Sequence, residues 1–204
     1  MPIISNKTLA NKSQIIIWKI DESLLEISDL LKRNTEEINK VIAIRNEKVR
    51  KEKLICHVLI QSFFDENCYL TKNDWGAPEL SNTNKRISLT HSYPYVGLYI
   101  SNHPCGVDLE KVTDKIVRIK HKFLNDSEDI WASEDIQKIT QVWSAKEVGF
   151  KIYQKGNVIF KDNMDVKPSN GSLDLFFTKP DCAFKSELNV DSIEGTVLVY
   201  GQLN

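Results

Sequence analysis

The order of helical and strand-like segments is the feature that most limits the folds open to this 204-residue chain. Apolar residues at intervals of three and four indicate helices, and short β-branched or aromatic runs indicate strands. The strand-like run Ile15–Ile20 comes first, helical spacing extends from about residue 36 to 63, and three short strands follow. The same order then returns, with helical spacing from about residue 115 to 153 and four short strands. This order predicts an α+β protein and is compatible with two similar halves, although no residue-level repeat supports them.

Cap and turn residues set the expected boundaries of these segments. Asp21 and Ser23 are the candidate caps of a short helix over residues 24–31, and Asn34 with Glu37 resembles a capping box that opens the long helix. Residues 65–86 are rich in turn formers and predict a loop. The remaining strands are expected at residues 87–91, 95–100, 106–110, 158–160, 173–177, 183–190 and 196–201.

Composition and charge exclude several classes of protein. Hydrophobic residues make up 41% and charged residues 27% of the chain, which is typical of a globular protein. The net charge of -1 gives no overall field toward nucleic acid or anionic lipid, so neither is expected as a partner. The four cysteines are far apart and show neither a zinc spacing nor a disulfide framework. With no signal-peptide pattern and no apolar run long enough for a membrane span, we expect a cytoplasmic protein with reduced thiols.

The segment Gly106-Val107-Asp108-Leu109-Glu110 alternates apolar and acidic residues. Residues two apart on a strand share a face, so Val107 and Leu109 are expected in the core, with Asp108 and Glu110 facing outward together. Their Cα atoms would lie roughly 6.6 Å apart, a spacing from which two carboxylates can converge on one hard cation such as Mg2+. The alternative is an ordinary strand with its charges toward solvent.

A second acidic candidate lies in the helical segment from Val142 to Lys151. Lys146 falls on the same stripe as apolar and aromatic residues, while Glu147 and Lys151 flank that stripe four residues apart. Glu147 and Lys151 could form an ordinary ion pair, and Lys146 could extend its charged end to solvent along an apolar face. The position of Lys146 within the stripe is the feature that these explanations account for least well.

His91 ends a predicted strand beside two small hydroxyl residues, Thr90 and Ser92. A histidine in that place can donate to a phosphate, or it can be a satisfied strand-end residue. Five basic residues lie in the predicted helix upstream, and they point to all sides of it. Most of them must therefore face solvent, although one or two could contact a phosphate. The five are Arg45, Lys48, Arg50, Lys51 and Lys53.

Three blocks in this order resemble the 4'-phosphopantetheinyl transferase superfamily. They are Ser88-Leu89-Thr90-His91-Ser92, Gly106-Val107-Asp108-Leu109-Glu110, and Trp143-Ser144-Ala145-Lys146-Glu147 continuing to Lys151. The spacings also fit, with 17 residues from His91 to Asp108 and 39 from Asp108 to Glu147. Weaker matches are Gly76-Ala77-Pro78, Arg50-Lys51-Glu52, and Lys122-Phe123-Leu124 followed by Glu128. The resemblance covers about residues 45 to 155.

The resemblance implies a fold and an activity. The chain length is similar to the surfactin-type branch, in which one chain forms a pseudodimer of two α/β halves, each a small, mostly antiparallel sheet packed on a long helix. The halves are expected at residues 1–103 and 104–204, the second carrying the carboxylates. The implied enzyme, also called holo-acyl-carrier-protein synthase, transfers the 4'-phosphopantetheine arm of coenzyme A to a serine of an apo carrier protein and releases 3',5'-ADP.

The resemblance also implies roles for individual residues. The expected magnesium ligands are Asp108, Glu110 and Glu147, with Mn2+ as an alternative ion. Glu147 or a water that it holds is the expected general base, and Lys151 the second catalytic residue. The residues expected to contact coenzyme A are Arg50, Thr90, His91, Ser92, Asp108, Lys146 and Lys151.

The resemblance also implies binding partners, and two alternative functions stay open. The implied partners are coenzyme A and an acyl or peptidyl carrier protein, the chain itself being a monomer. Carrier domains are usually acidic around the target serine, so a local basic face formed by Lys115, Arg118, Lys120 and Lys122 could steer them. The alternatives are a non-catalytic member that binds coenzyme A or a carrier protein, and another metal-dependent phosphoryl or nucleotidyl transferase.

The sequence departs from the family pattern at two positions. Ala77 replaces a turn lysine, so one contact to coenzyme A is expected to be absent. Gly149 lies inside the helix, where glycine costs about 1 kcal/mol relative to alanine. Neither change touches a carboxylate.

Overall fold

The computed structural model describes residues 2–203 and forms two compact units, Met1–Asn102 and His103–Asn204. Each unit combines an antiparallel sheet with several helices, which confirms the predicted α+β class. Hydrophobic side chains form a separate core in each unit. The two units are described in turn because the residues of interest divide between them.

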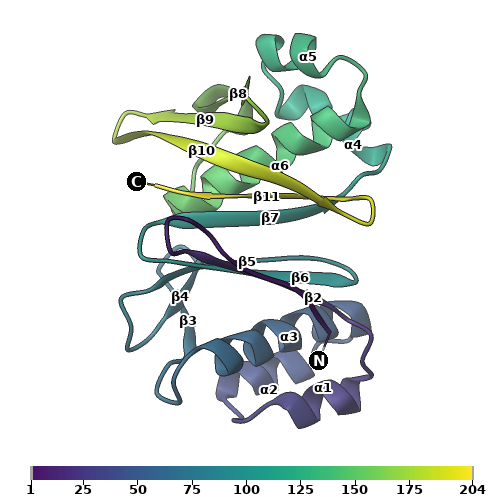
Figure 1. Cartoon of the computed structure of the whole chain (residues 1–204), viewed down its shortest axis with the longest axis vertical. Coiled ribbons are helices and arrows are strands. Elements are labelled where there is room, and N and C mark those ends of the chain that lie inside the picture. Colours follow the sequence, from purple (N-terminus) through teal and green to yellow (C-terminus); the bar gives the residue numbers. More distant parts are fainter. Residues whose placement is uncertain (1, 204) are drawn as a thin grey trace. The chain divides into compact units, whose positions relative to one another are not determined.

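Unit 1 contains a four-stranded antiparallel sheet in the order β1-β2-β6-β5. Helix α3 lies between this sheet and the two shorter helices (Figure 1). The strands are β1 Ile3–Thr8, β2 Gln14–Lys19, β5 Arg86–Ser92 and β6 Tyr95–Ser101, and a separate hairpin joins β3 Leu70–Lys72 to β4 Pro78–Leu80. The helices are α1 Leu24–Leu30, α2 Glu36–Ile42 and α3 Glu47–Phe63.

Local capping explains why the long helix predicted for unit 1 is two helices. The Thr35 side chain accepts the Ile38 N–H at the start of α2, and the Asn46 side chain accepts the Val49 N–H at the start of α3. The predicted capping box at Asn34 is therefore wrong by one residue, and a second cap was missed. Ser23 caps α1 as expected, in a full capping box with Glu26.

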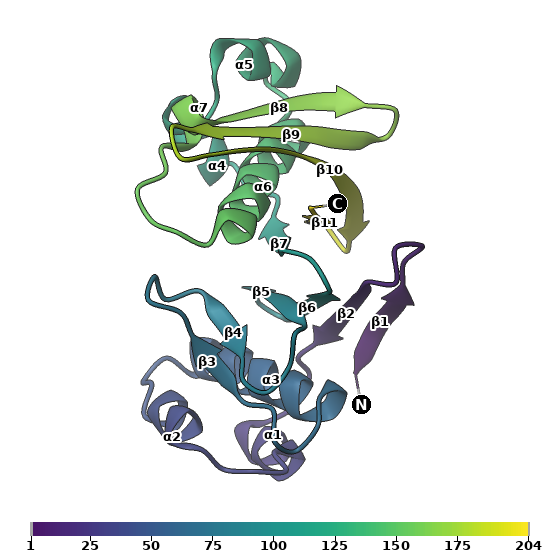
Figure 2. The same cartoon turned by 90° about the vertical axis from the view of Figure 1, so that its left-hand side faces the viewer.

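Unit 2 contains a five-stranded antiparallel sheet in the order β7-β11-β10-β9-β8. Helix α6 lies against one face of this sheet (Figure 2). The strands are β7 Cys105–Lys111, β8 Met164–Ser169, β9 Ser172–Lys179, β10 Cys182–Ile193 and β11 Thr196–Gln202. The helical segments are α4 Lys115–Ile119, the 3-10 turn η1 Lys120–Lys122, α5 Asp126–Ala132, α6 Ile136–Tyr153 and α7 Phe160–Asn163.

Edge strands account for most of the errors in the predicted elements. Strands β1 and β8 were missed because both are sheet edges with polar residues, and β8 contains Pro168, which is tolerated at an edge. The strand expected at residues 158–160 is absent, and helix α7 begins at Phe160. The hairpin β3–β4 lies inside the predicted loop.

Close packing explains Gly149, which the sequence left without a benefit. A Cβ atom at Gly149 would lie 2.6 Å from Leu175 Cδ2 and 2.9 Å from Met164 Sδ. Glycine therefore lets α6 approach strands β8 and β9, which offsets its cost inside a helix.

All four cysteines are free thiols. Within residues 2–203, no helix is both long and apolar enough to cross a membrane.

Candidate active site

The carboxylates of β7 point toward helix α6, which corrects the predicted orientation of the strand. Asp108 pairs with Val199 and Glu110 with Val197 across the β7–β11 ladder, and both valines belong to the core beneath α6. Cross-strand partners share a face, so both carboxylates lie on the helix side of the sheet. Val107 and Leu109 are buried on the opposite face. Asp108 is only 6% exposed, so it does not face solvent as predicted.

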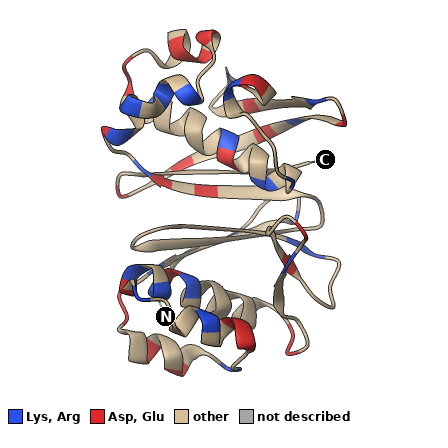
Figure 3. Cartoon of the chain, turned by 180° about the vertical axis from the view of Figure 1, so that it is seen from behind, with Lys and Arg blue, Asp and Glu red and all other residues tan. Residues whose placement is uncertain are grey.

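Glu147 of α6 lies within electrostatic reach of both strand carboxylates. Burial raises the pKa of Glu147 to about 7, and the negative charge of Asp108 is the second cause. Burial also raises the pKa of Glu110, again with Asp108 second, while a hydrogen bond from Trp143 opposes the rise. The structure thus brings together the three acidic residues that the sequence predicted (Figure 3 shows acidic positions on α6 and on the neighbouring strand).

Lys151 supplies the positive charge in this cluster. Its Nζ donates to Asp108 Oδ1 at 2.8 Å and to the Val107 carbonyl at 2.8 Å. The ordinary i,i+4 pair with Glu147 is therefore not what holds Lys151, although its charge lowers the pKa of Glu147. With 25% of its side chain exposed, the ammonium group can also meet a ligand.

Gly106 permits the close approach of α6 and β7. A Cβ atom there would lie 2.5 Å from the Val148 carbonyl oxygen and 2.8 Å from Val148 Cγ1. Any larger residue would push the helix away from the strand. The glycine two positions before Asp108 is therefore part of the geometry that brings the carboxylates together.

The donor set fits a hard divalent cation in chemistry and charge. Carboxylate oxygens are the ligands that Mg2+ prefers. Burial is the main cause of the raised pKa values of Glu110 and Glu147, and a cation would relieve the repulsion from Asp108 that adds to it. In the side-chain positions found here, however, no group of three His, Cys, Asp or Glu residues within 2–203 is arranged to hold a metal ion. The magnesium ligation predicted for Asp108, Glu110 and Glu147 stays a prediction.

Lys146 does not reach the carboxylate cluster, which corrects the role predicted for it. The side chain is fully buried, and its Nζ donates to Glu128 Oε2 at 2.7 Å. The carbonyls of Phe123, Phe160 and Met164 lie within 2.6 to 3.1 Å of the same nitrogen. Four oxygens occupy the ammonium group, so it is unavailable to coenzyme A.

The buried pair is a structural junction in unit 2. Burial lowers the pKa of Lys146 and raises that of Glu128, because an apolar site disfavours both charges. Glu128 also accepts the backbone N–H groups of Asn125 and Val166, so the pair connects α5, α6 and β8. The sequence showed that Lys146 was out of place on its stripe but gave no sign of its partner.

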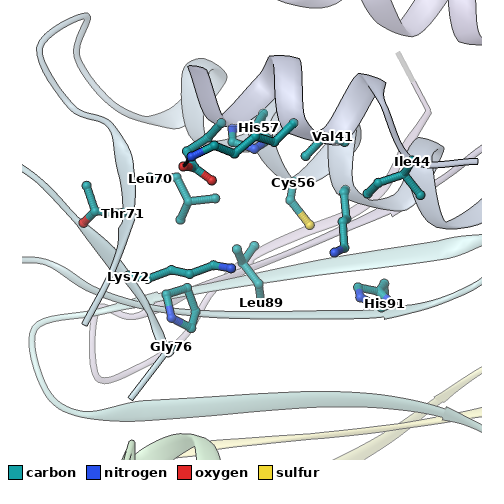
Figure 4. A pocket seen from close by; sticks show the side chains of 14 residues that line it. Val41, Ile44, Cys56, His57, Leu70, Thr71, Lys72, Gly76, Leu89 and His91 are labelled. Atoms are coloured by element: carbon teal, nitrogen blue, oxygen red, sulfur yellow. Dashed lines mark hydrogen bonds and ion pairs between the residues drawn. The ribbon is translucent and has the colours of Figure 1, made fainter. Parts of the chain in front are cut away.

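Unit 1 contains a separate pocket of about 620 Å3 that includes His91. The Glu52 carboxylate, which is buried, lies 3.4 Å from His91 Nδ1 and fixes the position of the ring. Figure 4 shows His57, Lys72 and His91, from α3, β3 and β5, lining one space. The lining residues are Glu37, Lys40, Val41, Ile44, Lys53, Cys56, His57, Leu70, Thr71, Lys72, Gly76, Pro78, Leu89 and His91.

The other residues predicted to bind coenzyme A do not line this pocket. Leu89 and His91 share the pocket face of β5, so Thr90 and Ser92 lie on the opposite face of that strand. Arg50 donates to the Ile42 carbonyl at 3.4 Å. Contacts from these three residues stay predictions. The sequence missed Lys72 and His57, because neither belongs to a motif and only the fold places them beside His91.

The comparison with known proteins identifies a relative. No protein-family model matches the chain. The 4'-phosphopantetheinyl transferase gsp of Aneurinibacillus migulanus is 30% identical over 115 residues, which cover 53% of this chain and 48% of that protein. The match thus spans about half the length of the curated relative. Over that half, the chain is similar to a 4'-phosphopantetheinyl transferase, a member of the superfamily that its motifs resemble.

Proposed function

We propose that this protein transfers the 4'-phosphopantetheine arm of coenzyme A to a serine of an apo carrier protein. The observation that carries the proposal is the cluster of Asp108, Glu110 and Glu147 with Lys151 beside them. The name of the relative, a 4'-phosphopantetheinyl transferase, supports the same reaction.

In the proposed reaction, the serine Oγ forms a bond to the β-phosphorus of coenzyme A. The bond from that phosphorus to the bridging oxygen breaks, and 3',5'-ADP leaves with the oxygen. The serine proton passes to Glu147 or to a water that Glu147 holds. A carboxylate with a pKa of about 7 is poised to accept a proton near neutral pH.

The remaining residues of the cluster position and neutralise the substrate. Asp108, Glu110 and Glu147 would hold Mg2+, which supplies charge stabilisation for the pyrophosphate when bound. Lys151 would neutralise a pyrophosphate oxygen, and moving it from Asp108 would leave that carboxylate for the ion. His91 would bind a phosphate of the nucleotide, the role that the resemblance implies for it.

The test is incubation with coenzyme A, Mg2+ and several apo carrier proteins, followed by intact mass measurement of each carrier. We expect one carrier to gain the phosphopantetheine arm, 3',5'-ADP to appear, and EDTA to stop the reaction. A different leaving group would indicate another phosphoryl or nucleotidyl transferase. Binding of coenzyme A without transfer to any carrier would favour the non-catalytic alternative.

A further inference from the structure

Lys151 is held at the candidate site by two oxygens of strand β7. Its Nζ lies 2.8 Å from Asp108 Oδ1 and 2.8 Å from the Val107 carbonyl oxygen, so a carboxylate and a backbone carbonyl share the ammonium group. The side chain of Asp108 is only 9% exposed, and a hydrogen bond between charged groups is stronger where water is largely excluded. The ammonium group is therefore a fixed positive charge at a carboxylate that the proposed ion would also use.

The charge of Lys151 also acts on the other two carboxylates of the cluster. Burial, and after it the charge of Asp108, raises the pKa of Glu147, while the charge of Lys151 opposes the rise. The same three influences act on the pKa of Glu110, where a hydrogen bond from Trp143 opposes the rise as well. Lys151 thus partly neutralises all three acidic residues, as a bound cation would do in the same place.

Lys151 and a divalent ion oppose each other at Asp108 Oδ1. Mg2+ binds its carboxylate ligands at roughly 2.0–2.1 Å, so an ion on this oxygen would lie within about 5 Å of the ammonium nitrogen. Two positive charges at that distance repel, and the repulsion is larger where water is largely excluded. The lysine must therefore move before the ion binds tightly. Its side chain is 25% exposed, which gives the ammonium group access to solvent or to a ligand.

We propose that Lys151 is an internal counter-cation that competes with the divalent ion for Asp108 and leaves it when a pyrophosphate takes the ammonium group. The inference rests on the proposed function for the identity of the ion and of coenzyme A. In the free protein, the lysine keeps ion binding weak. The pyrophosphate of coenzyme A offers the ammonium group other anionic oxygens, and the carboxylate that it leaves becomes available to the ion. Ion and coenzyme A therefore bind cooperatively, and the site holds the ion tightly only when the substrate is present.

Titration with Mn2+ tests the proposal without a carrier protein or turnover, because free and bound Mn2+ differ in their electron paramagnetic resonance signal. The wild type should bind Mn2+ about 10-fold more tightly with coenzyme A than without it, after correction for Mn2+ bound by coenzyme A itself. Lys151→Gln should bind Mn2+ alone about 10-fold more tightly than the wild type does, the scale of one hydrogen bond to a charged group, and should gain less from coenzyme A. Mn2+ at one fixed concentration should also raise the unfolding temperature of Lys151→Gln more than that of the wild type.

Two further variants separate the contact with Asp108 from a general effect of charge. Lys151→Arg keeps a positive charge that can pair with Asp108, so it should keep the weak Mn2+ binding of the wild type. The matched control is Lys155→Gln, because Lys155 follows α6, is 52% exposed and lies 3.9 Å from Asp181. It should bind Mn2+ like the wild type.

Several results would overturn the proposal. Mn2+ binding by Lys151→Gln that is no tighter than that of the wild type would do so, and so would an equal gain in Lys155→Gln. Lys151→Met takes the place of Lys151→Gln if the latter does not fold. A wild type that binds no Mn2+, or binds it equally with and without coenzyme A, overturns the proposal without any variant.

The outcome is distinguishable from that of the proposed function. If the protein loads no carrier but Mn2+ binding shows the expected dependence on Lys151 and coenzyme A, the transferase proposal fails and the role of Lys151 stands. If it loads a carrier while Lys151→Gln binds Mn2+ like the wild type, only the role of Lys151 fails.

Discussion

Glu147 is the residue on which the proposed chemistry depends most. It lies beside two other carboxylates in a partly buried place, where its charged form is disfavoured. Such an arrangement reduces stability in the free protein, because like charges must be held together. The same arrangement favours a bound cation and a proton acceptor near neutral pH, so the cost is consistent with a functional site.

Removing the charge of Glu147 should separate activity from stability. We expect Glu147→Gln to lower the transfer rate by about 10²- to 10⁴-fold, the range for loss of a general base, since the amide can neither accept the serine proton nor bind the ion strongly. Stability at pH 8 should be equal or higher, because a repelled charge is gone. Mass-detected transfer and chemical denaturation measure the two effects. Transfer at nearly the wild-type rate would contradict the role of Glu147.

The raised pKa of Glu147 also predicts how stability depends on pH. In the unfolded chain the carboxyl loses its proton near its ordinary pKa of 4.5, whereas in the folded protein it loses it at about 7. The folded state therefore binds more protons between these values, and the free energy of unfolding should fall as pH rises through them, by on the order of 2 to 3 kcal/mol from this group.

Denaturation at several pH values in wild type and Glu147→Gln isolates this contribution. Above pH 7 the difference between the two proteins should be constant, and it should shrink toward pH 5. The raised pKa of Glu110 acts in the same direction and is expected to leave a smaller slope in the variant. Parallel stability curves for the two proteins would show that Glu147 does not titrate in this window.

At the scale of elements, helix α6 carries two different kinds of charged residue. Glu147 and Lys151 face β7, where Gly106 permits close approach, and Lys146 enters the core and holds the start of β8. Neighbouring positions on one helix thus serve the site and the scaffold. The motif that resembles the family contains residues of the candidate site and a residue of the scaffold, and only their contacts distinguish the two.

Lys146→Met should therefore act on stability. It would leave Glu128 buried without its ion partner, a change that typically costs about 3–5 kcal/mol. The double variant Lys146→Met/Glu128→Leu should recover much of that loss, because no buried charge remains. Chemical denaturation of the two variants checks this expectation. An unchanged stability with a raised KM for coenzyme A would instead support the ligand role first predicted.

At the scale of the whole molecule, net charge is close to zero, so any steering of a carrier protein must be local. Three members of the predicted basic face, Lys115, Arg118 and Lys122, are exposed. Lys120 is neutralised by Asp129 at 2.9 Å and Glu134 at 3.1 Å, which removes it from that face.

Reversing the three exposed charges to glutamate should raise the KM for an acidic carrier about 10-fold at low salt with little change in kcat. The difference should shrink at high salt, where exposed charges are screened. Lys85→Glu serves as a control for charge reversal elsewhere on the chain. Kinetics that stay unchanged at low salt would remove these residues from carrier recognition.

The sequence by itself determined the α+β class and most of the strands, and it singled out the acidic residues of the candidate site. Strands β5, β6 and β7 were predictable because their apolar patterns are continuous and turn residues bound them. Asp108, Glu110 and Glu147 were singled out because the blocks that contain them resemble the motifs of a known family, whereas their pattern alone was also compatible with ordinary surface charges. The helix boundary at residues 43–46 and the polar edge strands β1 and β8 were not predictable, since single cap side chains and polar strands give weak local signals.

Only the tertiary structure decided which way the carboxylates face and what each lysine contacts. Alternation along β7 places Asp108 and Glu110 on one face, but the position of α6 determines that this face is covered as well as the opposite one. Lys146 is committed to Glu128, 18 residues earlier, and Lys72 reaches the pocket of His91 through the β3–β4 hairpin. Such contacts join residues distant in sequence, so their energies depend on packing that no local pattern encodes.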